Sequence, residues 1–235
     1  CACTSHFGYL EREEMFGGYV NIANAFAKIQ PRIFCLSEGI KKVYNVLMNI
    51  PKEKLFISPN GVNTAAFRST DVPHNGDRSI YLAKIDYRKR QHLFQSIDSL
   101  YYAGNIADER FDKEKNYLGE WSKEFLYNNL TEYGNLVLLS DGEAHPLVCM
   151  EAFAAGLGVV VTEWGKANLD VDKEFITVIP EKHIGDLQFL EYEIVKNRVY
   201  SVQHREEILK YAEKFDWINI VRDYYVPNVE KVISK

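Results

Sequence analysis

The sequence has no long apolar stretch. A membrane-spanning helix needs about 20 consecutive apolar residues, whereas the longest apolar run, at residues 157–161, is short and is interrupted by Gly158. No signal-peptide pattern opens the chain. An initial methionine is missing too, and the first residues resemble the interior of a domain. We therefore expect an N-terminally truncated sequence without a membrane-spanning segment.

Cysteine and positive charge are scarce. The four cysteines, Cys1, Cys3, Cys35 and Cys149, match no zinc-binding spacing. Cys149 lies in an apolar run, which is typical of a buried thiol, and this use of cysteine favours a reducing, cytoplasmic setting. With 28 Lys and Arg against 33 Asp and Glu, the net charge is -5. No overall basic field therefore argues for nucleic acid as a partner.

Short apolar runs alternate with amphipathic segments along most of the chain. Residues 136–139 are continuously apolar, as in a parallel strand that is buried on both faces. Ser37 is a good N-cap for a helix that follows it. The alternation predicts an α/β protein with doubly wound parallel sheets. The other expected strands are 32–36, 55–58, 79–82, 100–103, 159–162 and 176–179, and the other expected helices are 16–29, 123–133, 147–155, 187–198 and 201–214.

One segment has the composition of a linker. Residues 71–78 are rich in Asp, Pro, His, Asn and Gly and contain few large apolar groups. A domain boundary is expected in such a segment. We therefore assign residues 1–70 to the end of one domain and residues 79–214 to a second domain.

The segment around residues 140–151 has the features of an anion-binding site. A buried strand is expected to end at Ser140, and a loop then leads into a helix near Leu147. In open α/β sheets, ligands bind beyond the carboxyl ends of the strands. The free N–H groups at a helix N-terminus bind phosphate there. The backbone around Pro146, Leu147 and Val148 can supply such donors.

Two carboxylates lie eight residues apart in this segment, Glu143 in the loop and Glu151 on the helix. Eight residues are slightly more than two helical turns, so both can reach one face. One carboxylate can then meet a sugar hydroxyl while the other holds a ribose. The spacing alone fits two surface carboxylates equally well, but Glu151 lies among apolar residues, where a carboxylate needs a polar partner.

A basic segment follows the first strand of the second domain. Lys84, Arg88 and Lys89 lie in it. Cationic side chains at the carboxyl end of a strand can neutralise a diphosphate leaving group when no metal is present. A solvated basic turn is the alternative interpretation of the same residues.

Taken in order, these motifs resemble glycosyltransferase family 4, whose members adopt the GT-B fold of two Rossmann-like domains. The E-x7-E motif at residues 143–151 and its flanks are the most specific feature. The other similar segments are residues 4–6 (a strand end with a histidine), 34–38 ("VSE"), 57–64 with Phe67 ("NGVD…F") and 82–89 ("GR-x-K").

The resemblance implies a retaining glycosyltransferase that needs neither a metal nor a cofactor. Its donor would be a nucleotide-sugar such as a UDP- or GDP-sugar, and its acceptor a glycan, a lipid or a small molecule, with peripheral membrane contact as an option. Residues 215–235 would form the helix that crosses back to the first domain. The implied roles are the reaction centre for His6, the transferred sugar for Glu143, the ribose for Glu151, the diphosphate for Lys84 and Lys89, and further donor contacts for Arg88, His145, Pro146, Leu147 and Val148.

Several positions depart from the family pattern. Ala83 stands where Gly is usual, Lys84 where Arg is usual, and Arg90 where Gly is common. Lysine keeps the charge but loses the bidentate fork of arginine. The stretch between Lys89 and Glu143 is also short, so part of a strand-helix unit is expected to be trimmed. These departures keep a second interpretation open, a non-catalytic or degenerate nucleotide-sugar-binding module.

Some aromatic residues have two interpretations. His145 either contacts the donor or stabilises its loop by a hydrogen bond. Trp164 lies where it could line a nucleotide pocket, although packing against the sheet explains it as well. Trp121 and Trp217 have the surroundings of core anchors.

Overall fold

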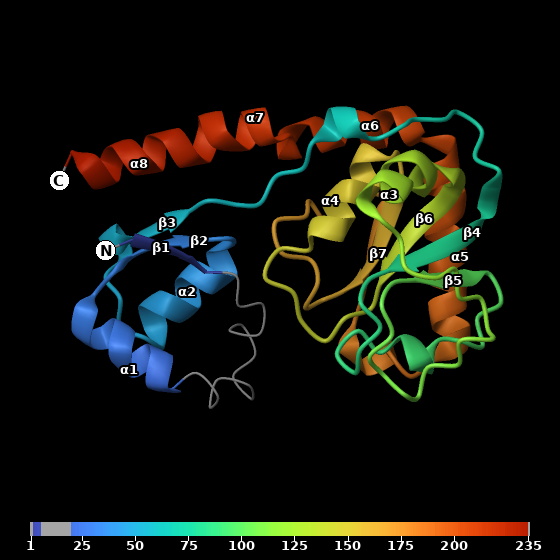
Figure 1. Cartoon of the computed structure of the whole chain (residues 1–235), viewed down its shortest axis with the longest axis horizontal. Helices are drawn as coiled ribbons and strands as arrows, with labels where there is room; N and C mark the ends of the chain where they lie inside the picture. The colour runs from blue at the N-terminus through green and yellow to red at the C-terminus, as the bar shows by residue number, and fades with distance from the viewer. Residues whose placement is uncertain (1, 6–19, 235) are drawn as a thin grey trace.

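A computed structural model describes residues 2–5 and 20–234. In that part of the chain the strands form two parallel sheets, one of three strands in the order β1-β2-β3 and one of five in the order β5-β4-β6-β7-β8. Figure 1 shows the two sheets side by side, each with its own helices. His6 and residues 16–19, where a helix was expected to begin, lie outside the described residues.

The first unit is a small parallel sheet with its two helices, α1 and α2, on the same side, below the sheet in Figure 1. Its core packs Ile40, Val43 and Tyr44 of α2 against the strands. The Ser37 hydroxyl accepts the Ile40 N–H at 3.2 Å, which confirms the predicted N-cap. Its elements are β1 (Ala2–Ser5), α1 (Val20–Ile29), β2 (Arg32–Cys35), α2 (Glu38–Val46), a 3₁₀ turn (Lys52–Lys54) and β3 (Leu55–Ile57).

The second unit is a larger sheet covered on both faces. Every residue of β6 (Tyr133–Leu138) and β7 (Gly158–Thr162) is buried, and the apolar runs expected to be buried strands, residues 136–139 and 159–162, lie largely within them. In Figure 1, α3 and α4 lie in front of the sheet and α5 lies behind it. The remaining elements are β4 (Asn75–Leu82), β5 (Leu100–Ala103), α3 (Lys123–Asn129), α4 (Leu147–Ala154), β8 (Ile176–Ile179), α5 (Leu187–Gln203) and α6 (Arg205–Ala212).

Two strands begin earlier than the sequence predicts. β4 starts at Asn75, inside the expected linker, and β6 starts at Tyr133, where a helix was expected to continue. Asn75 pairs with Tyr133, so each extension supports the other. Close approach explains the pairing, because a Cβ at Gly134 would lie 2.3 Å from the Gly76 carbonyl oxygen. Polar composition therefore concealed a strand whose partner lies far along the chain.

The crossovers on either side of β5 contain little helix. Residues 83–99 contain only the 3₁₀ turn Gln91–Leu93, and no helix precedes α3 after β5. The segment near Tyr117 runs parallel to β5, because the Leu118 N–H donates to the Tyr102 carbonyl at 2.8 Å. Asp108 ties the two crossovers together: it accepts two bonds of 2.8 Å from the Arg110 guanidinium and lies 3.3 Å from His92 Nδ1.

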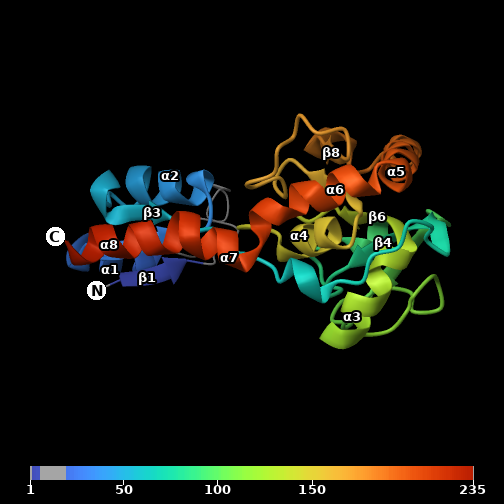
Figure 2. The ribbon, with the colours of Figure 1, turned by 90° about the horizontal axis from the view of Figure 1, so that it is seen from above.

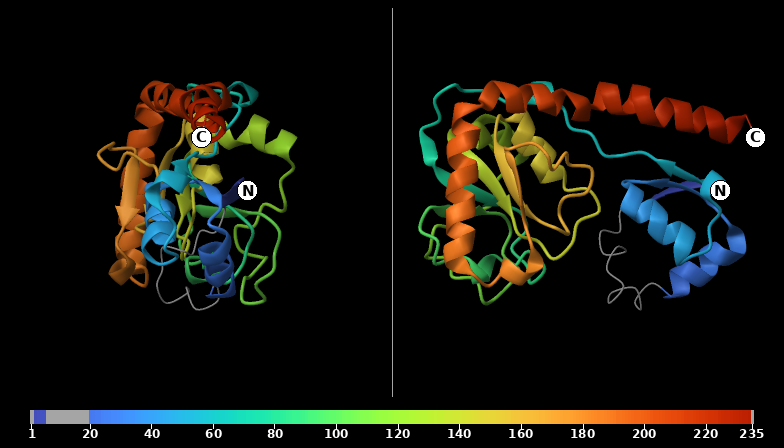
Figure 3. Two further views of the ribbon diagram at one scale, coloured as in Figure 1. Left: turned by 90° about the vertical axis from the view of Figure 1, so that its left-hand side faces the viewer. Right: turned by 180° about the vertical axis from the view of Figure 1, so that it is seen from behind.

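The last helices run from the second unit back across the first sheet, as Figures 2 and 3 show from above and from behind. They are α7 (Trp217–Ile220), a π-helical turn (Val221–Tyr225) and α8 (Val226–Ile233). The Val62 N–H donates to the Phe215 carbonyl at 2.9 Å, and the Asn228 amide donates to the Ile57 carbonyl at 2.6 Å. Across the described residues, no helix is both long and apolar enough to span a bilayer.

Candidate functional site

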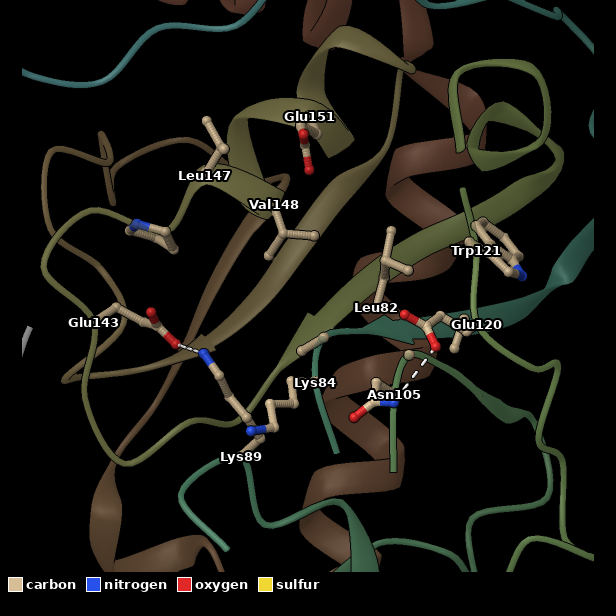
Figure 4. A pocket seen from close by; sticks show the side chains of 14 residues that line it. Leu82, Lys84, Lys89, Asn105, Glu120, Trp121, Glu143, Leu147, Val148 and Glu151 are labelled. Atoms are coloured by element: carbon tan, nitrogen blue, oxygen red, sulfur yellow. Dashed lines mark hydrogen bonds and ion pairs between the residues drawn. The ribbon is translucent and has the colours of Figure 1, made fainter. Parts of the chain in front are cut away.

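A pocket of about 480 Å³ opens at the carboxyl ends of β4, β5 and β6, beside the start of α4. Figure 4 shows its side chains converging from four segments of the second unit. Seven predicted site residues line it together, although they come from two separate stretches of sequence. The lining consists of Leu82, Ala83, Lys84, Lys89, Ala103, Gly104, Asn105, Glu120, Trp121, Glu143, Pro146, Leu147, Val148 and Glu151.

The loop after β4 is folded by Asp86. Its carboxylate accepts the backbone N–H groups of Arg88 and Lys89 at 3.0 and 3.1 Å. Arg90 adopts a left-handed conformation with φ 59°, which explains why glycine suits this position. The loop turns the Lys89 side chain into the pocket, whereas the Arg88 guanidinium bonds to Asp86 at 3.3 Å and lies outside the lining. Arg88 thus lies apart from the predicted donor residues that line the pocket.

Lys84 is held at the floor of the pocket by its backbone. Its carbonyl accepts the buried Gln91 amide at 3.0 Å. Gly104, opposite, has φ 145°, and a Cβ there would lie 2.0 Å from the Ala83 carbonyl oxygen. Within the described part of the chain, the Lys84 ammonium forms no ion pair, whereas Lys89 and Arg90 do. Lys84 is thus the cation of this loop that is ready for an anionic ligand.

Glu143 and Lys89 face each other across the pocket and form an ion pair, drawn as a dashed line in Figure 4. Both side chains are largely buried. The Glu143 backbone is fixed as well, because its N–H donates to the Trp164 carbonyl at 3.1 Å. A predicted sugar-binding carboxylate and a predicted diphosphate-binding cation thus neutralise each other here.

Glu151 lies inside α4, and its side chain is 8% exposed. Its carboxylate pairs with the ammonium of Lys123, which is 60% exposed at the start of α3. The expectation that this carboxylate needs a polar partner is confirmed. The sequence did not identify Lys123, because nothing in its local pattern distinguishes it from other exposed lysines.

The start of α4 supplies the backbone donors. Pro146 occupies the N-cap position, and Leu147 and Val148 lie in the first turn of the helix, where N–H groups have no carbonyl partner within the helix. All three residues line the pocket. The N-terminus of α4 therefore lines the same pocket as Lys84 and Lys89 of the loop after β4. N–H groups and cations together favour the binding of an anion.

His145 does not line the pocket. It is 5% exposed, and its Nδ1 accepts the Asn60 N–H of the first unit at 3.1 Å. Burial lowers the pKa of His145 to about 4, so the ring is neutral. Of the two interpretations, the hydrogen bond that stabilises the loop is present in the structure. The ring also packs against the ring of Phe215, with 6.2 Å between ring centres.

Three further residues complete the far end of the pocket. Asn105 donates to the Glu120 carboxylate at 3.5 Å, and Trp121 lies next to them (Figure 4). The Trp121 ring also meets Phe125 and Tyr133, with ring centres 5.1 and 5.9 Å away, so it is a core anchor that borders the pocket. Asn105 could have been predicted from the sequence, because it follows the end of the expected strand 100–103.

No protein-family model and no curated protein matches the chain. Solved structures do match its fold. One is HepE of Anabaena with UDP-glucose, with 13% identity and a TM-score of 0.75; the match covers all of this chain and 72% of HepE. Another is TarM, with 16% identity and a TM-score of 0.68; the match covers 99% of this chain and 49% of TarM. A third is the pneumococcal O-GlcNAc transferase GtfA with UDP and GlcNAc, with 13% identity and a TM-score of 0.70; the match covers 98% of this chain and 52% of GtfA. The chain spans about half the length of TarM and GtfA.

These neighbours are GT-B glycosyltransferases. At such low identities the similarity establishes the architecture, an α/β fold of the GT-B type with Rossmann-like units. The predicted fold class is therefore confirmed.

Proposed function

We propose that this chain carries the donor-binding half of a glycosyltransferase that transfers sugar from a nucleotide-sugar. The observation that carries the proposal is the convergence of Lys84, Lys89, Glu143 and Glu151 with the start of α4 on one pocket. The lysines and the backbone N–H groups can meet the phosphate groups of a nucleotide-sugar, and the carboxylates can meet its hydroxyl groups. HepE and GtfA, which share the fold, have UDP-glucose or UDP in their structures.

The donor is proposed to lie along the pocket in one direction. The sugar meets Glu143, and the diphosphate lies between Lys84, Lys89 and the first N–H groups of α4. The ribose meets Glu151, and the base reaches the end formed by Asn105, Glu120 and Trp121, where an aromatic edge and hydrogen-bonding groups are available (Figure 4).

The Lys89–Glu143 ion pair gives this arrangement a specific consequence. An incoming donor breaks this ion pair. Lys89 then binds the diphosphate, and Glu143 accepts hydrogen bonds from the sugar hydroxyls. The pair also keeps either charge from being buried without a partner while the site is empty.

The finer assignment is a retaining, metal-independent enzyme similar to glycosyltransferase family 4. A cationic clamp can stabilise the charge of the leaving diphosphate in place of a metal. In this proposal His6 lines the reaction centre, and the acceptor is a glycan, a lipid or a small molecule, with peripheral membrane contact as an option. The free thiols of Cys35 and Cys149 fit a cytoplasmic location.

The domain limits proposed with it are residues 1–70, 71–78 and 79–214, followed by the crossing segment 215–235. The linker residues from Asn75 onward belong to β4, so the connection without regular structure is confined to residues 71–74 in this proposal.

The second candidate is a nucleotide-sugar-binding module without transfer activity. It is favoured by Lys84, which lacks the bidentate fork of the arginine that is usual at this position in the family that the sequence resembles. Hydrolysis of the donor separates the two candidates: a transferase core releases sugar to water slowly, whereas a binding module leaves the donor intact.

The roles of the two glutamates are tested by titrating nucleotide-sugars and bare nucleoside diphosphates into variants. Glu143→Gln should lower the affinity for the sugar conjugate and change the affinity for the bare nucleoside diphosphate by less than about twofold. Glu151→Gln should weaken both by about tenfold, the loss expected for a charge-assisted hydrogen bond. If both variants bind like the parent, this pocket is not the donor site.

A further inference from the structure

The buried carboxylate of Glu151 depends on a partner from another part of the chain. Lys123 lies 28 residues earlier and pairs with the Oε1 atom. The two partners are unequally buried, because Glu151 is 8% exposed and Lys123 is 60% exposed. The carboxylate therefore bears most of the desolvation, and the lysine supplies compensation from the solvent side at a small cost of its own.

Lys123 is held in place by the start of α3. The Ser122 hydroxyl caps this helix by accepting the Phe125 N–H at 3.1 Å, so Lys123 is its first residue. The ammonium also lies 5.9 Å from the centre of the Tyr127 ring, within the range of a cation–π contact. Both contacts fix the direction from which the ammonium approaches Glu151.

The ion pair leaves the two oxygens of Glu151 in different states. Oε1 is engaged by Lys123, while in the described residues Oε2 has no hydrogen-bond partner. Glu151 lines the pocket and Lys123 does not. Any effect of Lys123 on a ligand in this pocket therefore passes through the carboxylate.

We propose that Lys123 is a positioning residue that orients Glu151 so that its second oxygen accepts the ribose hydroxyls of the donor. The inference rests on the proposed function, in which Glu151 meets the ribose. Lys123 holds the carboxylate in one rotamer through the ion pair to Oε1, and a carboxylate oxygen forms a strong hydrogen bond to a hydroxyl. Lys123 thereby sets the preference of the site for ribonucleotides over analogues that lack these hydroxyls.

The test compares UDP and GDP with their 2′,3′-dideoxy analogues by isothermal titration of the full chain. The parent should bind the ribonucleotide at least about tenfold more tightly, because a charge-assisted hydrogen bond is lost in the analogue. Lys123→Met should remove most of this preference while changing the affinity for the dideoxy analogue less than about twofold. Lys123→Arg should retain the preference, and Lys210→Met, at an exposed position of α6, is the matched control.

A double-mutant cycle protects the test against loss of folding. Glu151→Gln removes the buried charge, so the double variant with Lys123→Met leaves no carboxylate without its partner. Adding Lys123→Met to Glu151→Gln should change no affinity, because Lys123 acts through Glu151 alone. An equal loss for ribonucleotide and dideoxy analogue, or a further loss in the double variant, would show a direct charge contact and overturn the proposal. If Glu151→Gln removes the ribose preference and Lys123→Met does not, the proposal fails and the donor site stands. If the parent binds neither nucleotide, the proposed function fails with it.

Discussion

The hydrogen bond between His145 and the first unit makes stability depend on pH. His145 is buried, and its Nδ1 must be unprotonated to accept the Asn60 N–H. Burial lowers the pKa of His145 from 6.5 to about 4. Protonation would place an uncompensated charge in the interior and remove the acceptor of this bond at the same time.

The magnitude follows from proton linkage. The unfolded chain binds a proton at His145 near pH 6.5 and the folded chain only near pH 4, so stability is fully present above pH 6.5 and is lost as the pH falls toward 4. At 1.36 kcal/mol per pH unit, the difference corresponds to about 3 kcal/mol. That is a large part of the total stability of a typical domain.

Chemical denaturation between pH 4 and pH 8 measures this effect. His145→Phe keeps a ring at the position but removes the titrating group. Between pH 7 and pH 4, the unfolding free energy of the parent should therefore fall by about 3 kcal/mol more than that of the variant. Partial burial and the nearby Arg110 charge also lower the pKa of His92, which acts in the same direction. The difference between the parent and the variant is therefore the informative quantity. His74→Phe, at an exposed position, is the control. Parallel curves for the parent and His145→Phe would refute the reasoning.

Two further predictions concern the floor of the pocket. Gly104→Ala should destabilise the fold by about 1–3 kcal/mol in urea titrations, because its positive φ and its contact with Ala83 leave no room for a Cβ. Gly119→Ala is the matched control, since its φ is also positive but nothing lies within 4 Å, and an equal loss in both variants would contradict the steric explanation. Lys84→Met should weaken nucleoside diphosphates by about tenfold and leave nucleosides unchanged in equilibrium binding. An equal loss for both ligand types would contradict a role in binding the diphosphate.

Much of the site could be predicted from the sequence because it follows strand ends. A continuous apolar run before Ser140 marks a buried strand, so Glu143 and the start of α4 had to lie at its carboxyl end. Lys84 and Lys89 follow another strand of the same parallel sheet, and parallel strands bring their carboxyl ends to one edge. The apolar neighbours of Glu151 also showed that it needed a partner.

The rest depended on contacts between distant segments. His145 is adjacent to the predicted donor loop, but its side chain bonds to Asn60, which is 85 residues away. The first residues of β4 are polar, and they form a strand because Gly134 lets Gly76 approach closely. The identity of Lys123 as the partner of Glu151 likewise depended on where α3 packs.

The most direct test of the central claim is a thermal-shift screen of this chain against UDP, GDP, ADP and their common sugar conjugates, with Glu151→Gln measured in parallel. A ligand at 100 times its dissociation constant stabilises the folded state by about 2.7 kcal/mol. The account predicts a selective shift with one nucleotide, larger for its sugar conjugate and reduced in Glu151→Gln. A folded chain that shows no shift with any of these ligands, or a shift that Glu151→Gln leaves unchanged, would contradict a nucleotide-sugar site in this pocket.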